Sequence, residues 1–207
     1  MISKVSIVFY LLIHQTVGSD DNGAAVARNA LEQYLAKIPG AQAGGIEPVT
    51  DKIDSVTGTG HFAFSVRFRG YPLRPPKPFG NTNLFIVDHV GNVERVRNDK
   101  ELKRFFTKSL KSATSDAEAL AAFTSWLKLS TQLHQDGYYT FKLDEDSIRL
   151  RSEHGERIVS GKADVTEGGE GQIVATMRFD PSGRVTKTST DRKLLPGERP
   201  AAGRLAN

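Results

Sequence analysis

The chain has no cysteine among its 207 residues and a single tryptophan. Without cysteine it has no disulfides, no thiolate nucleophile and no thiolate metal ligand, and it lacks the residue that a bacterial lipoprotein anchor would need. After Ile13, no apolar run approaches the ~20 residues of a membrane-spanning helix. These absences exclude a disulfide-stapled scaffold and predict that the mature chain stays out of the bilayer.

Short catalytic signatures are missing as well. The sequence contains no G-x-S-x-G, no P-loop and no H-E-x-x-H. The histidines that follow the N-terminal segment do not stand at helical ligand spacing. The glycine cluster 168–171 precedes a predicted strand rather than a helix, so it fails the context of a dinucleotide fingerprint. The sequence therefore predicts no catalytic residue, no metal site and no cofactor.

Charge and apolar content are moderate. The formal net charge is +4 and hydrophobic residues make up 38% of the chain, which suffices for two modest cores. The basic excess is scattered, so it weakly favours anionic partners without indicating a nucleic-acid-binding protein.

The N-terminus has the features of an export signal. Lys4 precedes the apolar run Val5–Ile13, and small residues follow at cleavage spacing, as Thr16 with Gly18 or Val17 with Ser19. The alternative is a buried N-terminal strand. We expect a signal peptide over residues 1–18. Together with the missing cysteines, it predicts a protein exported to the bacterial periplasm or the extracellular space.

The sequence repeats itself once, at an offset of 92 residues. Residues 85–93 match residues 177–185, and each copy carries an Asp-x-x-Gly that is typical of a hairpin turn, at Asp88 and at Asp180. Helical positions match at the same offset: Ala30, Leu31, Tyr34 and Leu35 correspond to Ala122, Phe123, Trp126 and Leu127. The repeat predicts modules over 19–112 and 113–194, followed by a disordered tail over 195–207.

Apolar periodicity and capping residues place the elements of each module. We expect helices over 24–38, from Asn98 and from Ser115, the last two each opening with a capping box. Residues 40–48 are predicted to form a flexible connection. Strands are expected over 61–70, 83–87, 92–97, 138–143, 146–152, 157–166, 171–179 and 184–189. Because the connections are short, consecutive strands should be antiparallel. The predicted fold class is α+β, as two tandem modules with a helix packed on an antiparallel meander.

A helix followed by a meander that ends in V-x-D-x-x-G-x-V resembles the PepSY and cystatin-like modules of exported bacterial proteins. The resemblance rests on 85–96, on 177–188 and on the helices before them. It implies a non-catalytic module, or one that inhibits or chaperones a peptidase.

The strand over 61–70 alternates between an aromatic face and a polar, basic face, and a proline-rich loop follows it. We interpret its basic and aromatic residues as a surface for an anionic or extended partner. The alternative is a solvated face whose arginine stems cover their neighbours. The candidate binding residues are His61, Arg67, Arg69, Tyr71, Arg74 and Lys77, with Phe79 beside them.

The function predicted from these patterns is that of an exported, soluble, non-catalytic protein that binds a protein, peptide or anionic ligand of the cell envelope. Two alternatives remain. One is a peptidase-directed inhibitor or chaperone module, from the resemblance. The other is an enzyme whose site forms between the two modules, which converging acidic, basic and nucleophilic side chains in a cleft would indicate.

Overall fold

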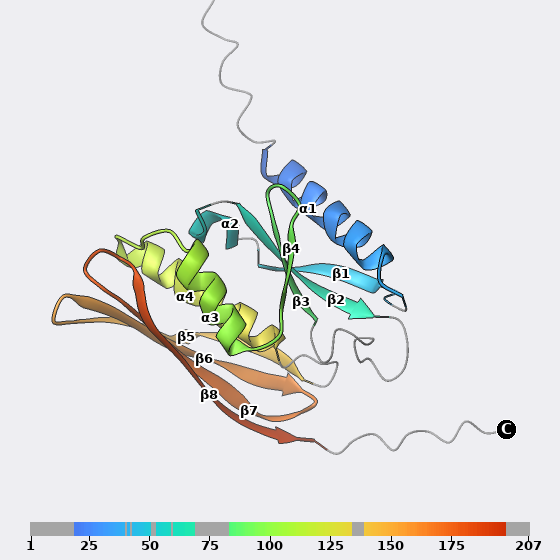
Figure 1. Ribbon diagram of the computed structural model, residues 1–207. Coiled ribbons are helices and arrows are strands. Elements are labelled where there is room, and N and C mark those ends of the chain that lie inside the picture. The colour runs from blue at the N-terminus through green and yellow to red at the C-terminus, as the bar shows by residue number, and fades with distance from the viewer. Residues whose placement is uncertain are drawn as a thin grey trace, which may run out of the picture.

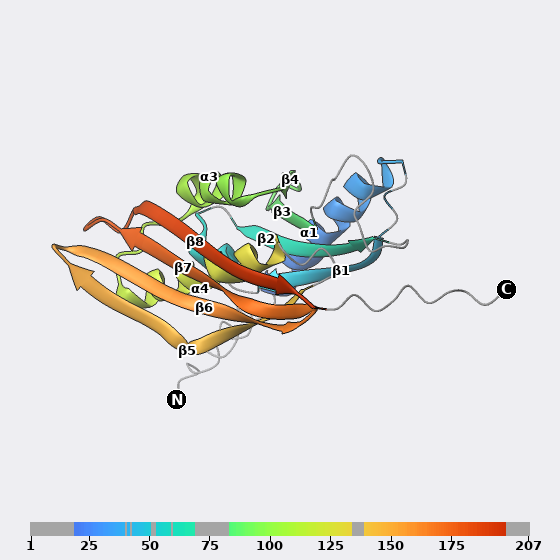
Figure 2. The same cartoon turned by 90° about the horizontal axis from the view of Figure 1, so that it is seen from below.

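The computed structural model describes residues 19–39, 41, 43–50, 53–58, 60–68, 83–133 and 139–197. The protein is α+β, with two antiparallel sheets of four strands, as Figures 1 and 2 show. The elements of the first half are α1 (Ser19–Ala36), β1 (Ala43–Thr50), α2 (Ile53–Val56), β2 (His61–Phe68), β3 (Leu84–Asp88), β4 (Val93–Val96) and α3 (Asp99–Ser109). Those of the second are α4 (Asp116–Gln132), β5 (Thr140–Glu153), β6 (Glu156–Glu167), β7 (Gly169–Phe179) and β8 (Val185–Pro196).

Both halves have the same strand order. The first sheet, sheet 1, runs β1-β2-β3-β4 and the second, sheet 2, runs β5-β6-β7-β8, and a long helix precedes each meander. The registers of the last hairpins also agree, because Val87 pairs with Val93 and Phe179 pairs with Val185. The first meander is followed by a helix, α3, whereas the described residues end at 197, directly after the second meander. The repeated sequence is therefore matched by a repeated topology.

The two Asp-x-x-Gly turns have the predicted structure. The Asp88 carboxylate accepts the backbone N–H groups of Val90 and Asn92, at 3.0 and 2.8 Å. In the second copy, Asp180 accepts the backbone N–H of Arg184 at 2.9 Å. Gly91 and Gly183 have φ of 88° and 81°, the left-handed region that glycine adopts without steric cost.

Both faces of sheet 1 are covered at its centre. The even residues Phe64, Val66 and Phe68 of β2 pack with α1 in one apolar cluster. Ala63, on the opposite face, is 2% exposed and belongs to the cluster that α3 and α4 share with sheet 2. The prediction that this second face of β2 is a polar surface is thus wrong at Ala63, because this residue is buried in a cluster that includes residues of α2, α3 and α4.

Helix α4 lies between the two sheets, as both views show (Figures 1 and 2). It is apolar on several sides, as expected for a helix with packing partners in more than one direction. Trp126 is 1% exposed, and its ring contacts Phe106 of α3 at 5.2 Å between centroids. The same cluster contains Ile86 of sheet 1 and Met177 of sheet 2. The division of the chain at 112/113 stays a prediction, but the largest core cluster takes residues from both sides of it.

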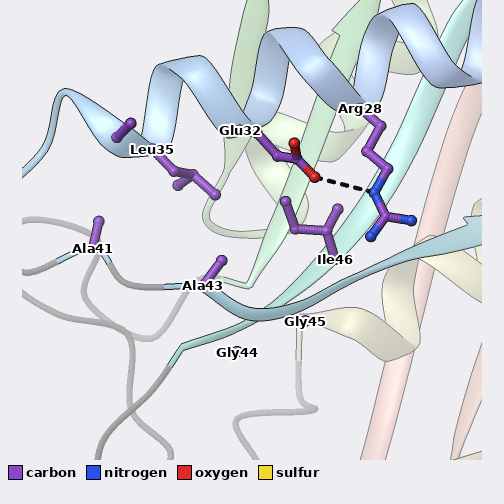
Figure 3. Close-up of a pocket in the computed structure, with 9 residues that line it drawn as sticks. Arg28, Glu32, Leu35, Ala41, Ala43, Gly44, Gly45 and Ile46 are labelled. Carbon is purple, nitrogen blue, oxygen red and sulfur yellow. Dashed lines mark hydrogen bonds and ion pairs between the residues drawn. The ribbon is translucent and has the colours of Figure 1, made fainter.

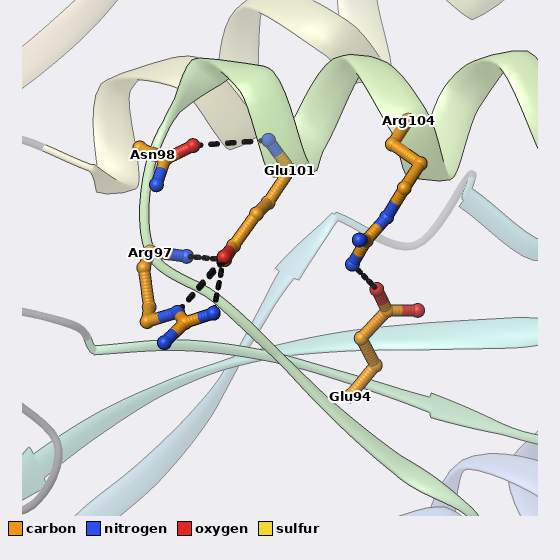
Figure 4. Close-up of polar contacts among 5 residues, drawn as sticks. All are labelled: Glu94, Arg97, Asn98, Glu101 and Arg104. Atoms are coloured by element: carbon orange, nitrogen blue, oxygen red, sulfur yellow. Dashed lines mark hydrogen bonds and ion pairs between the residues drawn. The ribbon is translucent and has the colours of Figure 1, made fainter.

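The predicted helix caps are present at α3 and α4. The side chain of Asn98 accepts the backbone N–H of Glu101 at 3.0 Å, while the Glu101 carboxylate accepts the backbone N–H of Arg97 at 2.8 Å (Figure 4). At α4, Ser115 and Glu118 form a reciprocal capping box. Hydrogen bonds from Arg97 lower the pKa of the Glu101 carboxyl.

Three predicted segments differ from the structure. Residues 40–48, predicted as a flexible connection, include most of β1. Of the tail predicted over 195–207, Leu195 and Pro196 belong to β8, paired with Glu170 and Gly169, and residues 198–207 lie outside the described residues. The strands predicted over 138–143 and 146–152 are one strand, β5.

The continuity of β5 depends on a bulge at the predicted break. Asp144 pairs with Lys162 and Arg149 pairs with Ser160, so four residues of β5 stand opposite one residue of β6. The Ser147 hydroxyl donates to the Asp144 carbonyl at 2.6 Å and accepts the Lys162 N–H at 2.9 Å. A side chain thus replaces the missing ladder bond, which the acidic composition of the segment does not reveal.

Candidate binding groove

The structure separates the predicted binding residues. Arg69, Tyr71, Arg74 and Lys77 lie outside the described residues, as does Phe79. His61 and Arg67 are described and stand at opposite ends of β2. With a rise of ~3.4 Å per residue, six residues separate them by about 20 Å. The two therefore do not form one site with each other.

His61 is packed into the first half of the molecule. Its ring lies edge-on to Phe105 of α3, with 5.0 Å between centroids, and its Nδ1 is 3.2 Å from the hydroxyl of the fully buried Thr57. Burial lowers the pKa of the His61 imidazole, although the Asp88 carboxylate acts in the opposite direction. A neutral, packed histidine supports the fold more than it exposes a cationic surface.

Arg67 lies next to the edge strand of sheet 1. It is opposite Gly45 of β1 in the strand register, and its guanidinium forms an ion pair with Glu47. The side chains of Arg67 and Glu47 are 66% and 60% exposed, so water screens the ion pair and it contributes little to folding stability. This end of β2 is a charged, solvent-exposed surface, and the role of Arg67 in binding stays a prediction.

The neighbouring strand β1 is the edge strand of sheet 1, and in the part of the chain that the structure describes it pairs with β2 and with no other strand. Val66 donates its backbone N–H to Asn83, on the β3 side. Because Ile46 stands opposite Val66, and because antiparallel pairs alternate, the N–H and C=O of Ile46 point away from β2. Pro48 has the same orientation, so its missing N–H costs no ladder bond. One residue of β1 therefore offers both backbone groups to an incoming strand.

A groove of about 390 Å³ runs beside this edge. Helix α1 forms one wall, β1 forms the other, and the buried side chains of Leu35 and Ile46 contribute apolar surface, as Figure 3 shows. An ion pair between Arg28 and Glu32, with 3.3 Å from nitrogen to oxygen, lies on the helix side. The remaining lining residues are small: Ala36, Ala41, Ala43, Gly44 and Gly45.

Glycine shapes the entrance of the groove. The register of β1 shifts between Ala43 and Gly45, which leaves Gly44 as the extra residue of a bulge. A Cβ at Gly45 would stand 3.3 Å from the end of the Arg67 guanidinium, so a larger residue here would push this flexible side chain slightly aside. The repeat gave no sign of this groove, because Gly44 and Gly45 lie in the segment predicted as a connection. A bulge at an edge strand leaves no periodic pattern in the sequence.

Two hollows lie at the junction of the halves, where the enzyme alternative places its site. One, of about 240 Å³, is lined mainly by Val56, Leu110 and alanines of α4, and the Glu118 carboxylate beside it is engaged by the cap of α4. The other, of about 190 Å³, lies between Val49 and Phe141. Among the described residues, neither lining contains a histidine or an aspartate.

Within the described residues, no group of three or more histidine or acidic side chains has a geometry that could hold a metal ion. Nor does any helix there have both the length and the apolar character needed to cross a membrane. Comparison with protein-family models, with curated proteins and with solved structures finds no match to this chain. The resemblance to PepSY and cystatin-like modules therefore stays a prediction from the quoted residues.

Proposed function

We propose that this protein is an exported, non-catalytic binding protein that captures an extended peptide segment of a partner along the open edge of β1. The observation that carries the proposal is the orientation of Ile46, whose backbone N–H and C=O both point away from β2 beside a preformed groove. Addition of a strand to a free sheet edge is a recurring mode of peptide recognition.

The two faces of β1 set the chemistry of the peptide. Alternate side chains of an added strand would face α1, where the groove offers apolar surface from Leu35 and the Arg28–Glu32 pair at its rim. The intervening side chains would meet Arg67 and Glu47 on the opposite face. We expect a segment that alternates an apolar residue with polar or charged ones.

The edge also limits the strength of binding. Ile46 offers a donor and an acceptor, whereas Pro48 can only accept, so a peptide gains about three backbone hydrogen bonds worth ~1 kcal/mol each. Such a proline discourages a long strand from pairing and thus protects the sheet edge against aggregation. The affinity should therefore depend on the groove and lie near the micromolar range, about −8 kcal/mol.

Selection from a random decapeptide display library, followed by amide NMR, tests the proposal. A selected peptide should slow hydrogen exchange at the Ile46 amide, which points outward, and leave the Glu47 amide unchanged because it already bonds to β2. The Ala36→Trp variant, which fills the groove from the exposed face of α1, should weaken binding at least about tenfold.

Gln33→Trp is the matched control, because Gln33 is exposed on the same helix but does not line the groove. It should bind the selected peptide like the parent protein. The proposal is overturned if selected peptides leave the Ile46 amide unchanged, if both tryptophan variants bind equally well, or if no peptide is retained.

A further inference from the structure

A second binding surface lies on the outer face of sheet 2, far from the groove in sequence. Helix α4 packs on the inner face, where Val159 and Ala163 of β6 are fully buried in the core. The alternating residues Ser160 and Lys162 point the other way. In Figure 2 the helices lie on one side of sheet 2, and no described element covers its other side.

The strand registers align basic side chains across this outer face. Arg151 pairs with Ile158, Ile158 pairs with Arg178, and Arg178 pairs with Lys187, so these residues form one row across the four strands. Arg149 stands two residues from Arg151 on the same face of β5. We call Arg151, Arg178 and Lys187, together with the adjacent Arg149, the basic row. Hydroxyl side chains continue from Arg149 across the sheet: Ser160, Thr176 and Ser189.

Ile158 shows how the long side chains of this row lie. It faces outward and belongs to neither core cluster, and yet it is only 1% exposed. Burial at such a position is the effect expected when the aliphatic stems of neighbouring Arg151 and Arg178 lie across it.

The row carries more positive than negative charge. Glu153 pairs with Arg151 at 3.1 Å and Glu156 approaches Arg178 at 3.6 Å. Within the described residues, Arg149 and Lys187 have no carboxylate partner. Lys187 also stands directly opposite Arg178, and like charges in that relation destabilise a sheet. An anion lying on the row would remove this repulsion.

We propose that the basic row binds an acidic polysaccharide chain that lies across the strands of sheet 2. At ~4.8 Å between neighbouring strands, the row from Arg151 to Lys187 extends over about 14 Å, enough for successive acidic groups of a sugar polymer. Guanidinium groups bind carboxylate and sulfate oxygens through paired hydrogen bonds. The hydroxyl groups beside the row can bond to sugar hydroxyls.

The remainder of the outer face selects against two other polyanions. Beyond the hydroxyl row, Asp144, Asp164 and Asp191 share this face with Lys142, Lys162 and Lys193, and Lys162 forms ion pairs with the first two aspartates. A planar anionic membrane would therefore meet a flank of balanced charge as well as the basic row. The outward positions of the described strands carry no aromatic residue, so the bases of a single-stranded nucleic acid would find no stacking surface. A linear polymer can follow the basic row without lying on this flank of balanced charge.

Fluorescence anisotropy with labelled octasaccharides of alginate and of heparin tests the proposal. The double variant Arg149→Ser/Lys187→Ser removes the two cations without carboxylate partners and should weaken binding at least about tenfold. The control Lys142→Ser/Lys193→Ser removes the same charge from the same strands and the same face, but outside the row, and should change affinity less than about twofold. All four side chains are exposed.

Binding to either octasaccharide that is lost in the row variant and kept in the control supports the proposal. It is overturned if neither octasaccharide binds, or if both variants lose affinity alike, which indicates non-specific charge attraction. It is also overturned if vesicles containing anionic lipid, or a single-stranded DNA of matched charge, bind more tightly through the row. The edge of β1 is untouched in these variants, so peptide capture should persist.

Discussion

The two repeated turns allow a comparison of equivalent glycines in different surroundings. Gly91 and Gly183 both have positive φ, so replacing either by alanine costs about 1–2 kcal/mol from the backbone alone. The new Cβ at Gly91 would meet only the methyl group of Ala30, at 3.3 Å. At Gly183 it would stand 2.5 Å from the carbonyl oxygen of Ala113, inside any real contact distance.

The larger cost at Gly183 follows from the segment that joins α3 to α4. Ala113 is 3% exposed and donates its N–H to the carbonyl of Gly183 at 2.8 Å, so moving the segment breaks a buried bond worth ~1 kcal/mol. Lost packing adds about 1 kcal/mol. We therefore expect Gly183→Ala to cost about 3–4 kcal/mol and Gly91→Ala about 1–2 kcal/mol.

Urea unfolding followed by the fluorescence of Trp126, with circular dichroism in parallel, measures both costs. With a slope of roughly 2 kcal/mol per molar urea, the midpoint should fall by about 1.5–2 M for Gly183→Ala and about 0.5–1 M for Gly91→Ala. Trp126 lies in the core cluster that both sheets share, so the two signals should change together. Equal midpoints for the two variants would refute the contact with Ala113, and separate transitions would refute the shared core.

Three further outcomes follow from individual side chains. Hydrogen bonds from Arg97 lower the pKa of the Glu101 carboxyl in the folded protein. The ionised carboxylate therefore stabilises the fold fully above the pKa of the unfolded chain, and this stabilisation is lost as the pH falls through the lower pKa of the folded protein. Glu101→Gln should cost about 1 kcal/mol at pH 7 and little in acid. Burial lowers the pKa of His61 in the folded protein, so the unfolded state takes up the proton first and the parent protein should lose stability below pH ~6.5. His61→Gln should remove this dependence of the unfolding free energy on pH, as measured by denaturant titrations at stepped pH. Ser147→Ala leaves the Lys162 N–H without its acceptor and should cost about 1–2 kcal/mol in urea unfolding.

Each of these outcomes has a control. Asn98→Ala removes the other side of the α3 cap and should cost a similar amount without the acid dependence. His154→Gln, at an exposed turn, should leave the slope near pH 6 in place. Ser152→Ala, also in β5 but exposed, should change stability by less than about 0.5 kcal/mol. If a control behaves like its paired variant, the assigned contact is wrong.

Local chemistry in the sequence was sufficient to predict much of the fold. The caps at Asn98 and Ser115, the turns at Asp88 and Asp180, and the apolar faces of the helices depend on residues within about four positions of each other, which are in contact whatever the rest of the chain does. The repeat added the order of helix and meander. These features are determined by the sequence by itself.

Contacts between distant segments decided the rest. The small, polar face of β2 looks solvated in the sequence, yet Ala63 is buried in a core cluster that includes residues of α3, α4 and sheet 2. The backbone N–H and C=O of Ile46 point away from β2 because Val66 bonds to Asn83 on its other side. The basic row exists only because four strands pair in one register. Periodicity states which residues share a face, but only the tertiary structure decides what covers that face and which edge stays open.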